Sequence, residues 1–248
     1  MTLEEYFESN RKVALAFSGG TDSAFLLYSA KRCGVDVKAY YVKSAFQPQF
    51  EMDDAIRLAG QLGADMEILN VDVLAVPEVA ANPEKRCYYC KRAIFGTITE
   101  AALKDGYTVV MDGTNASDDD SDRPGIRAVK ELSVHSPLRL CGLTKDLIRE
   151  LSKEAGLFTW NKPAYACLAT RVPTGTAICP EILEATEKAE DYLFSLGFYD
   201  FRVRYLDGAA KIQVVKDQLP MIIEHREEIF DRLKEWYKAV YLDLSVRK

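Results

Sequence analysis

The sequence predicts an α/β protein, in which a doubly wound parallel sheet is followed by a smaller C-terminal α+β domain. Three observations carry this prediction. Apolar runs of strand length alternate with segments of helical spacing as far as Ala155, and a glycine turn at 18–23 joins the first strand to the first helix. After about Trp160 the order changes to helix, two adjacent strands, helix and strand. We therefore expect two domains, at residues 1–160 and 161–248.

The expected strands of the first domain are apolar almost throughout, as strands buried on both faces are. They cover 12–17, 37–42, 66–71 and 107–111, with a short strand near Val134. The expected helices cover 21–32, 50–62, 88–104, 125–132 and 145–155, and Thr144 is the expected N-cap of the last one. Residues 73–83 predict a short helix and a loop, and the acidic run 112–122 predicts a loop.

The second domain begins with a helix at 181–196 that Gly197 ends. Strands at 201–206 and 210–215 follow, joined by a turn that contains Asp207 and Gly208. A helix at 219–237 and a strand at 240–244 complete the pattern.

The turn after the first strand has the composition of a phosphate-binding loop. It consists of Ser18, Gly19, Gly20, Thr21, Asp22 and Ser23. Glycines let a phosphate approach the backbone, and the free N–H groups of the following helix attract the anion. The hydroxyls add donors, and Asp22 is a candidate ligand of Mg²⁺. The loop is neither a Walker A motif nor a dinucleotide fingerprint, since the lysine and the glycine spacing are absent.

Other residues near strand ends are expected to complete this nucleotide site. Ligands of a parallel sheet bind at the carboxyl ends of its strands, so the segment 112–115 is expected to meet the glycine loop. We assign to the site Ser44, Gly113, Asn115 and Arg123.

Composition limits the possible functions and locations. The net charge of −6 argues against a nucleic-acid partner, which usually leaves a basic footprint. No apolar run has the length of a membrane helix, and the first residues do not form a secretory signal, so we expect a cytoplasmic protein. Its six cysteines are then expected to be mostly reduced, and a cluster of them indicates metal binding or catalysis.

Cys87 and Cys90 form a CxxC motif beside basic residues. From the residues alone the motif fits zinc, a redox dithiol, an iron–sulfur cluster or two core thiols. Zinc normally requires four ligands and no second CxxC exists, while a thioredoxin-like pattern is absent. Cys167, near the expected domain junction, is equally compatible with a core or a functional role. The isolated cysteines are interpreted as core or incidental residues, namely Cys33, Cys141 and Cys179.

Six motifs together carry a family resemblance. They are SGGTDS at 18–23, RCYYCK at 86–91, DGTN at 112–115, DRPG at 122–125, WNKP at 160–163 and ACLATR at 166–171. The first resembles the loop of the PP-loop ATP-pyrophosphatases, which have a HUP-like fold. In this order and spacing, the set resembles the LarE family of ATP-dependent sulfur transferases over nearly the whole chain.

The resemblance implies a reaction in the biosynthesis of the nickel-pincer nucleotide cofactor of lactate racemase. ATP adenylates a carboxylate of pyridinium-3,5-dicarboxylate mononucleotide, and sulfur then displaces AMP. Some members sacrifice one cysteine sulfur. Others hold a [4Fe-4S] cluster with three cysteines, whose positions match Cys87, Cys90 and Cys167. Three thiolates leave one iron without a protein ligand, so we favour the cluster form. The expected catalytic residues are Cys167, Cys87, Cys90 and Asp22. The expected cofactors are ATP, Mg²⁺ and the cluster.

The resemblance also assigns residues to the substrate. Arg202 and Arg204 face the same side of an expected strand, where two guanidiniums suit a phosphate, although a solvated strand face is the alternative. Glu190 and Arg171 are assigned to the same substrate site. The implied partner is a small-molecule nucleotide, and the implied assembly is a homo-oligomer, with a hexamer expected.

Three other functions fit parts of this pattern. A PP-loop enzyme could thiolate tRNA, against which the acidic charge counts, or could amidate a substrate with ammonia, which leaves the three cysteines unexplained. The chain could also be a non-catalytic nucleotide- or metal-binding module. Pyrophosphate release with the pyridinium nucleotide separates an enzyme from a module.

Overall fold

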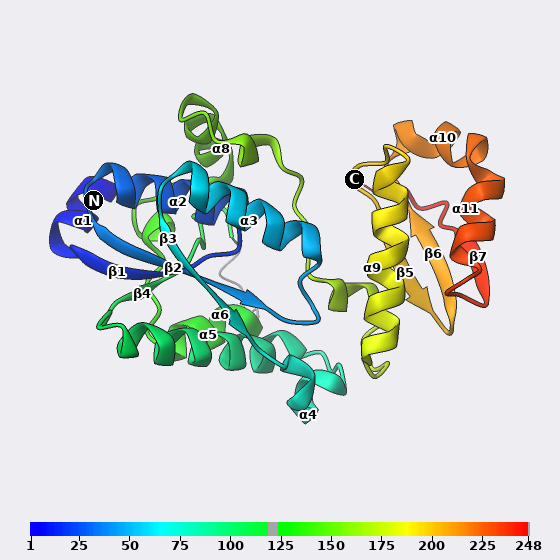
Figure 1. Cartoon of the computed structure of the whole chain (residues 1–248), viewed down its shortest axis with the longest axis horizontal. Coiled ribbons are helices and arrows are strands. Elements are labelled where there is room, and N and C mark those ends of the chain that lie inside the picture. The colour runs from blue at the N-terminus through cyan, green and yellow to red at the C-terminus, as the bar shows by residue number, and fades with distance from the viewer. Residues whose placement is uncertain (119–123, 248) are drawn as a thin grey trace. The chain divides into compact units, whose positions relative to one another are not determined.

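The computed structural model describes residues 1–118 and 124–247 and divides the chain into two compact units (Figure 1). The first unit comprises Met1–Val79 and Lys85–Lys162. The second comprises Ala80–Glu84 and the chain from Pro163 onward. Each unit has its own sheet, and each is described by itself below.

The first unit is built on a parallel sheet with the strand order β3-β2-β1-β4. Its strands are β1 (Lys12–Ala16), β2 (Asp36–Lys43), β3 (Asp65–Asn70) and β4 (Val110–Met111). The α-helices of this part of the chain are α1 (Leu3–Ser9), α2 (Thr21–Arg32), α3 (Gln49–Gln61), α4 (Pro77–Ala80), α5 (Arg86–Lys104), α6 (Pro124–Glu131), α7 (Pro137–Leu140) and α8 (Lys145–Glu154). Short 3₁₀ helices are η1 (Val73–Ala75) and η2 (Phe158–Asn161). The α/β fold class predicted from the sequence is confirmed.

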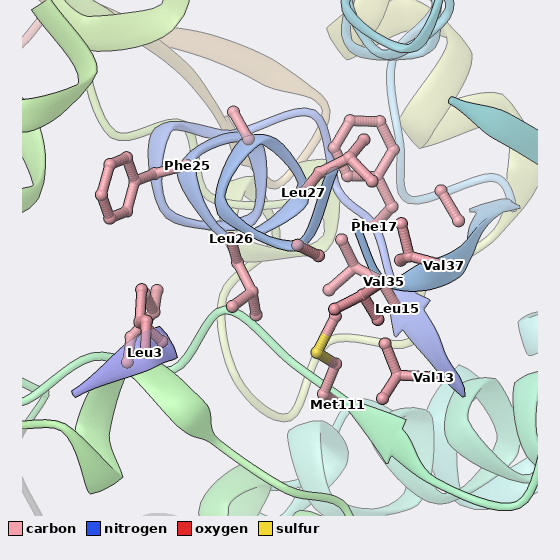
Figure 2. Close-up of a cluster of buried hydrophobic side chains, with 14 of the residues drawn as sticks. Leu3, Val13, Leu15, Phe17, Phe25, Leu26, Leu27, Val35, Val37 and Met111 are labelled. Atoms are coloured by element: carbon pink, nitrogen blue, oxygen red, sulfur yellow. The ribbon is translucent and has the colours of Figure 1, made fainter. Parts of the chain in front are cut away.

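Helices cover both faces of this sheet, with α2 and α3 on one side and α5 and α6 on the other (Figure 1). Side chains of each strand alternate between the two resulting cores. Val13 and Leu15 enter the core that contains α2, whereas Ala14 enters the core that contains α5. Figure 2 shows the first of these cores, in which residues of β1 point toward Leu26 and Leu27 of α2. Burial on both faces explains why the strands read as continuous apolar runs.

The second unit has a three-stranded sheet in the order β5-β6-β7. Its strands are β5 (Arg202–Leu206), β6 (Ala209–Gln213) and β7 (Ala239–Leu242), and only the β5–β6 pair is antiparallel. Its helices are η3 (Leu168–Arg171), α9 (Pro180–Ser195), η4 (Lys216–Gln218), α10 (Leu219–Glu224) and α11 (Arg226–Leu233). Val203, Ala210 and Ile212 face the core shared with α9 and α11.

Local hydrogen bonds account for the main differences from the predicted elements. The strand expected at 107–111 is reduced to two residues, because the N–H of Tyr107 donates to Ala102 at the end of α5. The helix expected at 219–237 divides at His225, whose ψ of 13° leaves the helical range. The sequence analysis missed α1, although Thr2 and Glu5 form a complete capping box at its start.

None of the helices in the described part of the chain combines the length and the apolar character that crossing a membrane requires.

Candidate functional site

The glycine loop between β1 and α2 folds around the hydroxyl of Ser23. This oxygen lies 3.0 Å from the Ser18 hydroxyl, accepts from the Ser18 N–H at 3.3 Å, and donates to the Gly20 carbonyl at 3.2 Å. Gly19 has φ of +70°, and a Cβ there would lie 2.9 Å from the Cβ of Ala55 in α3. Only glycine therefore fits this turn without strain. Gly20 is the N-cap of α2, and no described side chain caps it, so the N–H groups of the first turn keep the capacity to bind an anion.

Thr21 anchors the start of α2 to the rest of the first unit. It is buried, and its hydroxyl donates to the carbonyl of Thr159 at 2.8 Å. The hydroxyl predicted as a phosphate donor is thus engaged in holding the loop. A phosphate contact from Thr21 is expected from its backbone N–H instead.

The segment after β4 packs directly against the start of α2. A Cβ on Gly113 would lie 2.9 Å from the backbone nitrogen of Ser23, so glycine permits this close approach. The buried carboxylate of Asp112 shapes the turn by accepting from the Thr114 hydroxyl at 2.7 Å and the Ser136 hydroxyl at 2.8 Å. Two loops that are far apart in the sequence therefore meet at the carboxyl ends of β1 and β4.

The remaining residues assigned to the nucleotide site have structural partners or lie outside the described residues. Asn115 is buried, and its side-chain oxygen accepts from the N–H of Ser117 at 2.8 Å. Ser44 is also buried, and its hydroxyl donates to the side-chain oxygen of Gln47 at 2.6 Å in the turn after β2. Arg123 lies outside the described residues.

Lys145 is a charged residue of this region that the sequence analysis missed. Its ammonium lies 2.9 and 2.8 Å from the two carboxylate oxygens of Asp22. It is the first residue of α8, where a positive charge opposes the helix dipole. A lysine directly after the expected N-cap Thr144 was the signal that could have identified it.

Cys87 and Cys90 are the second and fifth residues of α5, three residues apart and therefore on the same side of the helix. Cys87 is exposed and Cys90 is half-buried. The Arg86 guanidinium lies 3.7 Å from the Cys87 sulfur, and the positive end of the helix dipole is nearby. The position suits two anionic thiolate ligands.

Cys167 belongs to the second unit, where it precedes η3 and is half-buried. Its segment is held by arginines that donate to backbone carbonyls: Arg171 to Ala166 at 2.8 Å, Arg202 to Ala164 at 2.7 Å and Arg204 to Thr170 at 3.2 Å. Over residues 1–118 and 124–247, no three Cys, His, Asp or Glu side chains gather as a metal site does. The shared cluster of three cysteines stays a prediction.

Arg171 and Glu190 form a buried ion pair in the second unit, with side chains 1% and 2% exposed. The Glu190 carboxylate accepts from the guanidinium at 2.8 and 3.0 Å, from the N–H of Val203 at 2.9 Å and from the hydroxyl of Tyr165 at 2.5 Å. These donors occupy both oxygens of the carboxylate. Glu190 therefore organises the region around Arg171, and its assignment to the substrate stays a prediction.

Arg202 and Arg204 lie on the face of β5 opposite Val203, as the alternation of a strand predicts. Burial, followed by the charges of Arg171 and Arg247, lowers the pKa of Arg202 to about 10. The same causes lower the pKa of Arg204. Arg202 and Arg204 are thus each repelled by Arg171 and Arg247, which nearby carboxylates offset in part, and a bound anion would relieve this repulsion.

Cys33 and Cys141 line a different part of the first unit. Both border a cavity of about 750 Å³, which lies against the last turns of α2 and includes none of the predicted site residues. Both pack against the hydrophobic core, and burial raises the pKa of each thiol. These properties agree with their interpretation as core residues.

The parallel sheet, the glycine loop after its first strand and the second loop that meets it are consistent with a PP-loop ATP-pyrophosphatase. No protein-family model matches the chain. It is 35% identical to an uncharacterised protein of Synechocystis sp. over 90% of this chain and 83% of that protein. It is 31% identical to the pyridinium-3,5-bisthiocarboxylic acid mononucleotide synthase of Lactiplantibacillus plantarum, over 98% of this chain and 90% of that enzyme.

A more distant similarity covers part of the chain. The tRNA-specific 2-thiouridylase MnmA of Thermotoga maritima is 28% identical over 61% of this chain and 54% of its own length. The chain belongs to the LarE family of ATP-dependent sulfur transferases.

Gly113→Ala tests the contact between the two loops. We expect the added methyl to displace the start of α2 at a cost of about 1–3 kcal/mol, and to lower the affinity for ATP by roughly tenfold or more. Gly96→Ala in α5 is the matched control, because a Cβ there would have no described atom within 4 Å apart from the backbone of its own helix. Isothermal titration with ATP measures both variants. Equal ATP affinities in the two would contradict the contact.

Proposed function

We propose that this enzyme replaces a carboxylate oxygen of pyridinium-3,5-dicarboxylate mononucleotide with sulfur, in the biosynthesis of the nickel-pincer nucleotide cofactor of lactate racemase. The observation that carries the proposal is the similarity to the pyridinium-3,5-bisthiocarboxylic acid mononucleotide synthase, which extends over 98% of this chain. The meeting of the glycine loop with Gly113 supports it, because adenylation requires a site for the phosphates of ATP.

The chemistry explains why ATP is consumed. A carboxylate is a poor electrophile, since its leaving group would be an oxide ion. Attack of a carboxylate oxygen on the α-phosphorus of ATP forms the acyl-adenylate and releases pyrophosphate. Attack of sulfur on the acyl carbon then breaks the bond to AMP and leaves the thiocarboxylate, with the sulfur's proton released to solvent. AMP is a good leaving group because its phosphate carries the bonding electrons.

Residues of the first unit are suited to the adenylation step. The N–H groups of the first turn of α2 bind phosphate oxygens, and the Gly19 backbone leaves room for their approach. The carboxylate of Asp22 would hold Mg²⁺, which when bound would supply positive charge beside the phosphates of ATP. Thr21 and Gly113 keep the loop in position through their contacts with Thr159 and Ser23.

The three cysteines can supply the thiolate ligands that a [4Fe-4S] cluster requires, and the proposed route of sulfur delivery depends on these ligands. Cys87 and Cys90 share one side of α5 at its positive end, and Cys167 is the third expected ligand. When bound through three thiolates, the cluster would supply an iron without a protein ligand, at which sulfur can be held. Arg171, Arg202 and Arg204 keep the Cys167 segment in place. The alternative is that the sulfur of Cys167 is itself transferred.

The arginines of the second unit are suited to the phosphate of the substrate nucleotide. The lowered pKa values of Arg202 and Arg204 reflect burial together with neighbouring positive charges. A phosphate binds guanidiniums in a bidentate manner and offsets this repulsion. Glu190 then acts as a positioning residue, since it holds Arg171.

The test is pyrophosphate release on mixing the enzyme with Mg²⁺, ATP and one acceptor at a time. We expect release with pyridinium-3,5-dicarboxylate mononucleotide and thiocarboxylate formation by mass spectrometry when a sulfur source is present. Release with unmodified tRNA, or amide formation with ammonia, would instead favour the other PP-loop activities. The absence of release with every acceptor would support a binding module.

Asp22→Ala supplies the inactive variant for this assay. Loss of the Mg²⁺ ligand is expected to slow pyrophosphate release about 100-fold or more, because metal stabilisation of the departing charge contributes several kcal/mol. Asp53→Ala, an exposed carboxylate of α3, is the matched control and is expected to keep normal activity. Comparable rates in the two variants would remove Asp22 from the site.

A further inference from the structure

Lys145 occupies a position that its own helix does not explain. It begins α8, where a cation meets the positive end of the dipole, yet its ammonium bonds to both oxygens of Asp22. The two side chains are 31% and 24% exposed, so solvent and ligands reach the pair. Its backbone N–H donates to the Ser117 hydroxyl at 2.9 Å, which ties the start of α8 to the loop that follows β4.

This pairing conflicts with the binding of a metal ion at Asp22. The ammonium of Lys145 takes one lone pair of each Asp22 oxygen, and its positive charge lies on the side of the carboxylate where a second cation would share both oxygens. The two cations also repel each other strongly at such distances. The ammonium therefore competes with Mg²⁺ for Asp22, and Asp22 binds Mg²⁺ more tightly once the ammonium of Lys145 has moved away.

Phosphates bound at α2 provide the place to which the ammonium moves. Asp22 is the second residue of α2, so the uncapped N–H groups of the first turn are adjacent to the ion pair. A lysine has a flexible stem and a compact charge, and a short rotation is enough to exchange a carboxylate for a neighbouring phosphate. The glycine loop itself contains no lysine.

We propose that Lys145 binds the phosphates of ATP and occupies Asp22 until ATP and Mg²⁺ arrive together. This inference rests on the proposed function only in taking the glycine loop as the phosphate site. The ion pair neutralises Asp22 in the free enzyme. When ATP and Mg²⁺ bind, two new ion pairs replace it. These are Asp22 with Mg²⁺ and Lys145 with the phosphates that leave as pyrophosphate.

The first measurement compares the binding of ATP with that of AMP by isothermal titration in the presence of Mg²⁺. Lys145→Gln is expected to lower ATP affinity about 10- to 100-fold, because one charge-assisted hydrogen bond is lost. The affinity of this variant for AMP is expected to stay within about twofold of the wild-type value. Lys145→Arg keeps the charge and is expected to retain most of the ATP affinity. Lys153→Gln, at the other end of α8, is the matched control, because its ammonium lies over the Trp160 ring.

The second measurement follows Mn²⁺ binding to the free enzyme by electron paramagnetic resonance, without nucleotide. Lys145→Gln is expected to bind Mn²⁺ more tightly than the wild type, because the carboxylate of Asp22 is released. Asp22→Asn in the same background should remove this gain. A purely structural lysine would weaken or not alter Mn²⁺ binding, so this readout separates the two roles.

Two results would overturn the inference. One is equal loss of ATP and AMP affinity in Lys145→Gln, and the other is unchanged Mn²⁺ binding by that variant. Neither measurement uses the pyridinium substrate or a sulfur source. Failure of sulfur transfer would therefore leave this inference standing, and failure here would leave the proposed sulfur transfer standing.

Discussion

Single replacement of Cys87, Cys90 or Cys167 by alanine is expected to remove iron from the anaerobically purified enzyme and to lower thiocarboxylate formation by about 100-fold or more. The reason is that a cluster with three protein ligands loses its attachment when one thiolate is removed. Pyrophosphate release is expected to persist, since the phosphate site proposed at the start of α2 uses none of these thiols. Iron, acid-labile sulfide and visible absorption are measured beside the two activities.

The controls for this experiment come from the same chain. Cys33→Ala and Cys141→Ala remove half-buried thiols that border a separate cavity, and both variants are expected to keep iron and activity. If the wild-type protein is iron-free and only Cys167→Ala is inactive, Cys167 is the sacrificial sulfur donor. Dehydroalanine at position 167 after one turnover would establish that alternative. Iron-free wild-type protein with many turnovers would contradict both mechanisms.

Glu190→Ala is expected to lower the free energy of unfolding of the second unit by about 3–5 kcal/mol. The change leaves the guanidinium of Arg171 buried at 1% exposure without its carboxylate. It also removes the acceptor of the Tyr165 hydroxyl and of the Val203 N–H. Each of these polar groups then pays the cost of burial without a hydrogen bond.

The two tryptophans allow the second unit to be followed separately. Trp160 lies in the first unit and Trp236 in the second. In a Trp160→Phe background, fluorescence during urea unfolding therefore reports on the second unit. The double variant Arg171→Met/Glu190→Leu is expected to recover the part of the loss that comes from the unpaired charge of Arg171, because apolar replacements leave no buried charge. The Tyr165 hydroxyl and the Val203 N–H still lack their acceptor in this variant, so the recovery is partial.

An exposed ion pair of the same helix is the matched control for Glu190. Lys188→Ala removes a partner of Glu184, and both side chains of that pair are largely exposed. A change below about 1 kcal/mol is expected there. Similar effects of Glu190→Ala and Lys188→Ala would show that the buried pair contributes no more than a surface one.

Residues whose role depends on local chemistry were predictable from the sequence. The helix at 21–32 has the observed bounds, and Thr144 caps α8 as expected, its hydroxyl accepting from the Leu147 N–H. Both follow from glycine, hydroxyl and apolar patterns within one or two helical turns. The strand at 107–111 was predicted too long, and the helix at 219–237 was predicted as continuous although it divides at His225. Pairing partners decide the first and backbone angles the second.

The candidate site divides in the same way. The motif at 18–23 identified the glycine loop, but it could not show that the Thr21 hydroxyl bonds to a carbonyl 138 residues away. Strand alternation predicted that Arg202 and Arg204 share one face, but it could not show that they donate to carbonyls of the Cys167 segment. Lys145 was not predicted, because its partner Asp22 is separated from it by 123 residues.

The sequence by itself determined that this protein is an α/β enzyme with a phosphate loop after its first strand and two thiols in one helical turn. Glycine turns, hydrophobic periodicity and short motifs are local features of the chain, so they can be recognised without a structure. Only the tertiary structure decided that Lys145 neutralises Asp22 and that Glu190 is enclosed by donors. Both pairings join groups that are distant in the sequence and become neighbours only in the folded chain. Burial removes water from these charged groups, and because an unpaired buried charge is costly, each group pairs with an opposite charge or a hydrogen-bond donor.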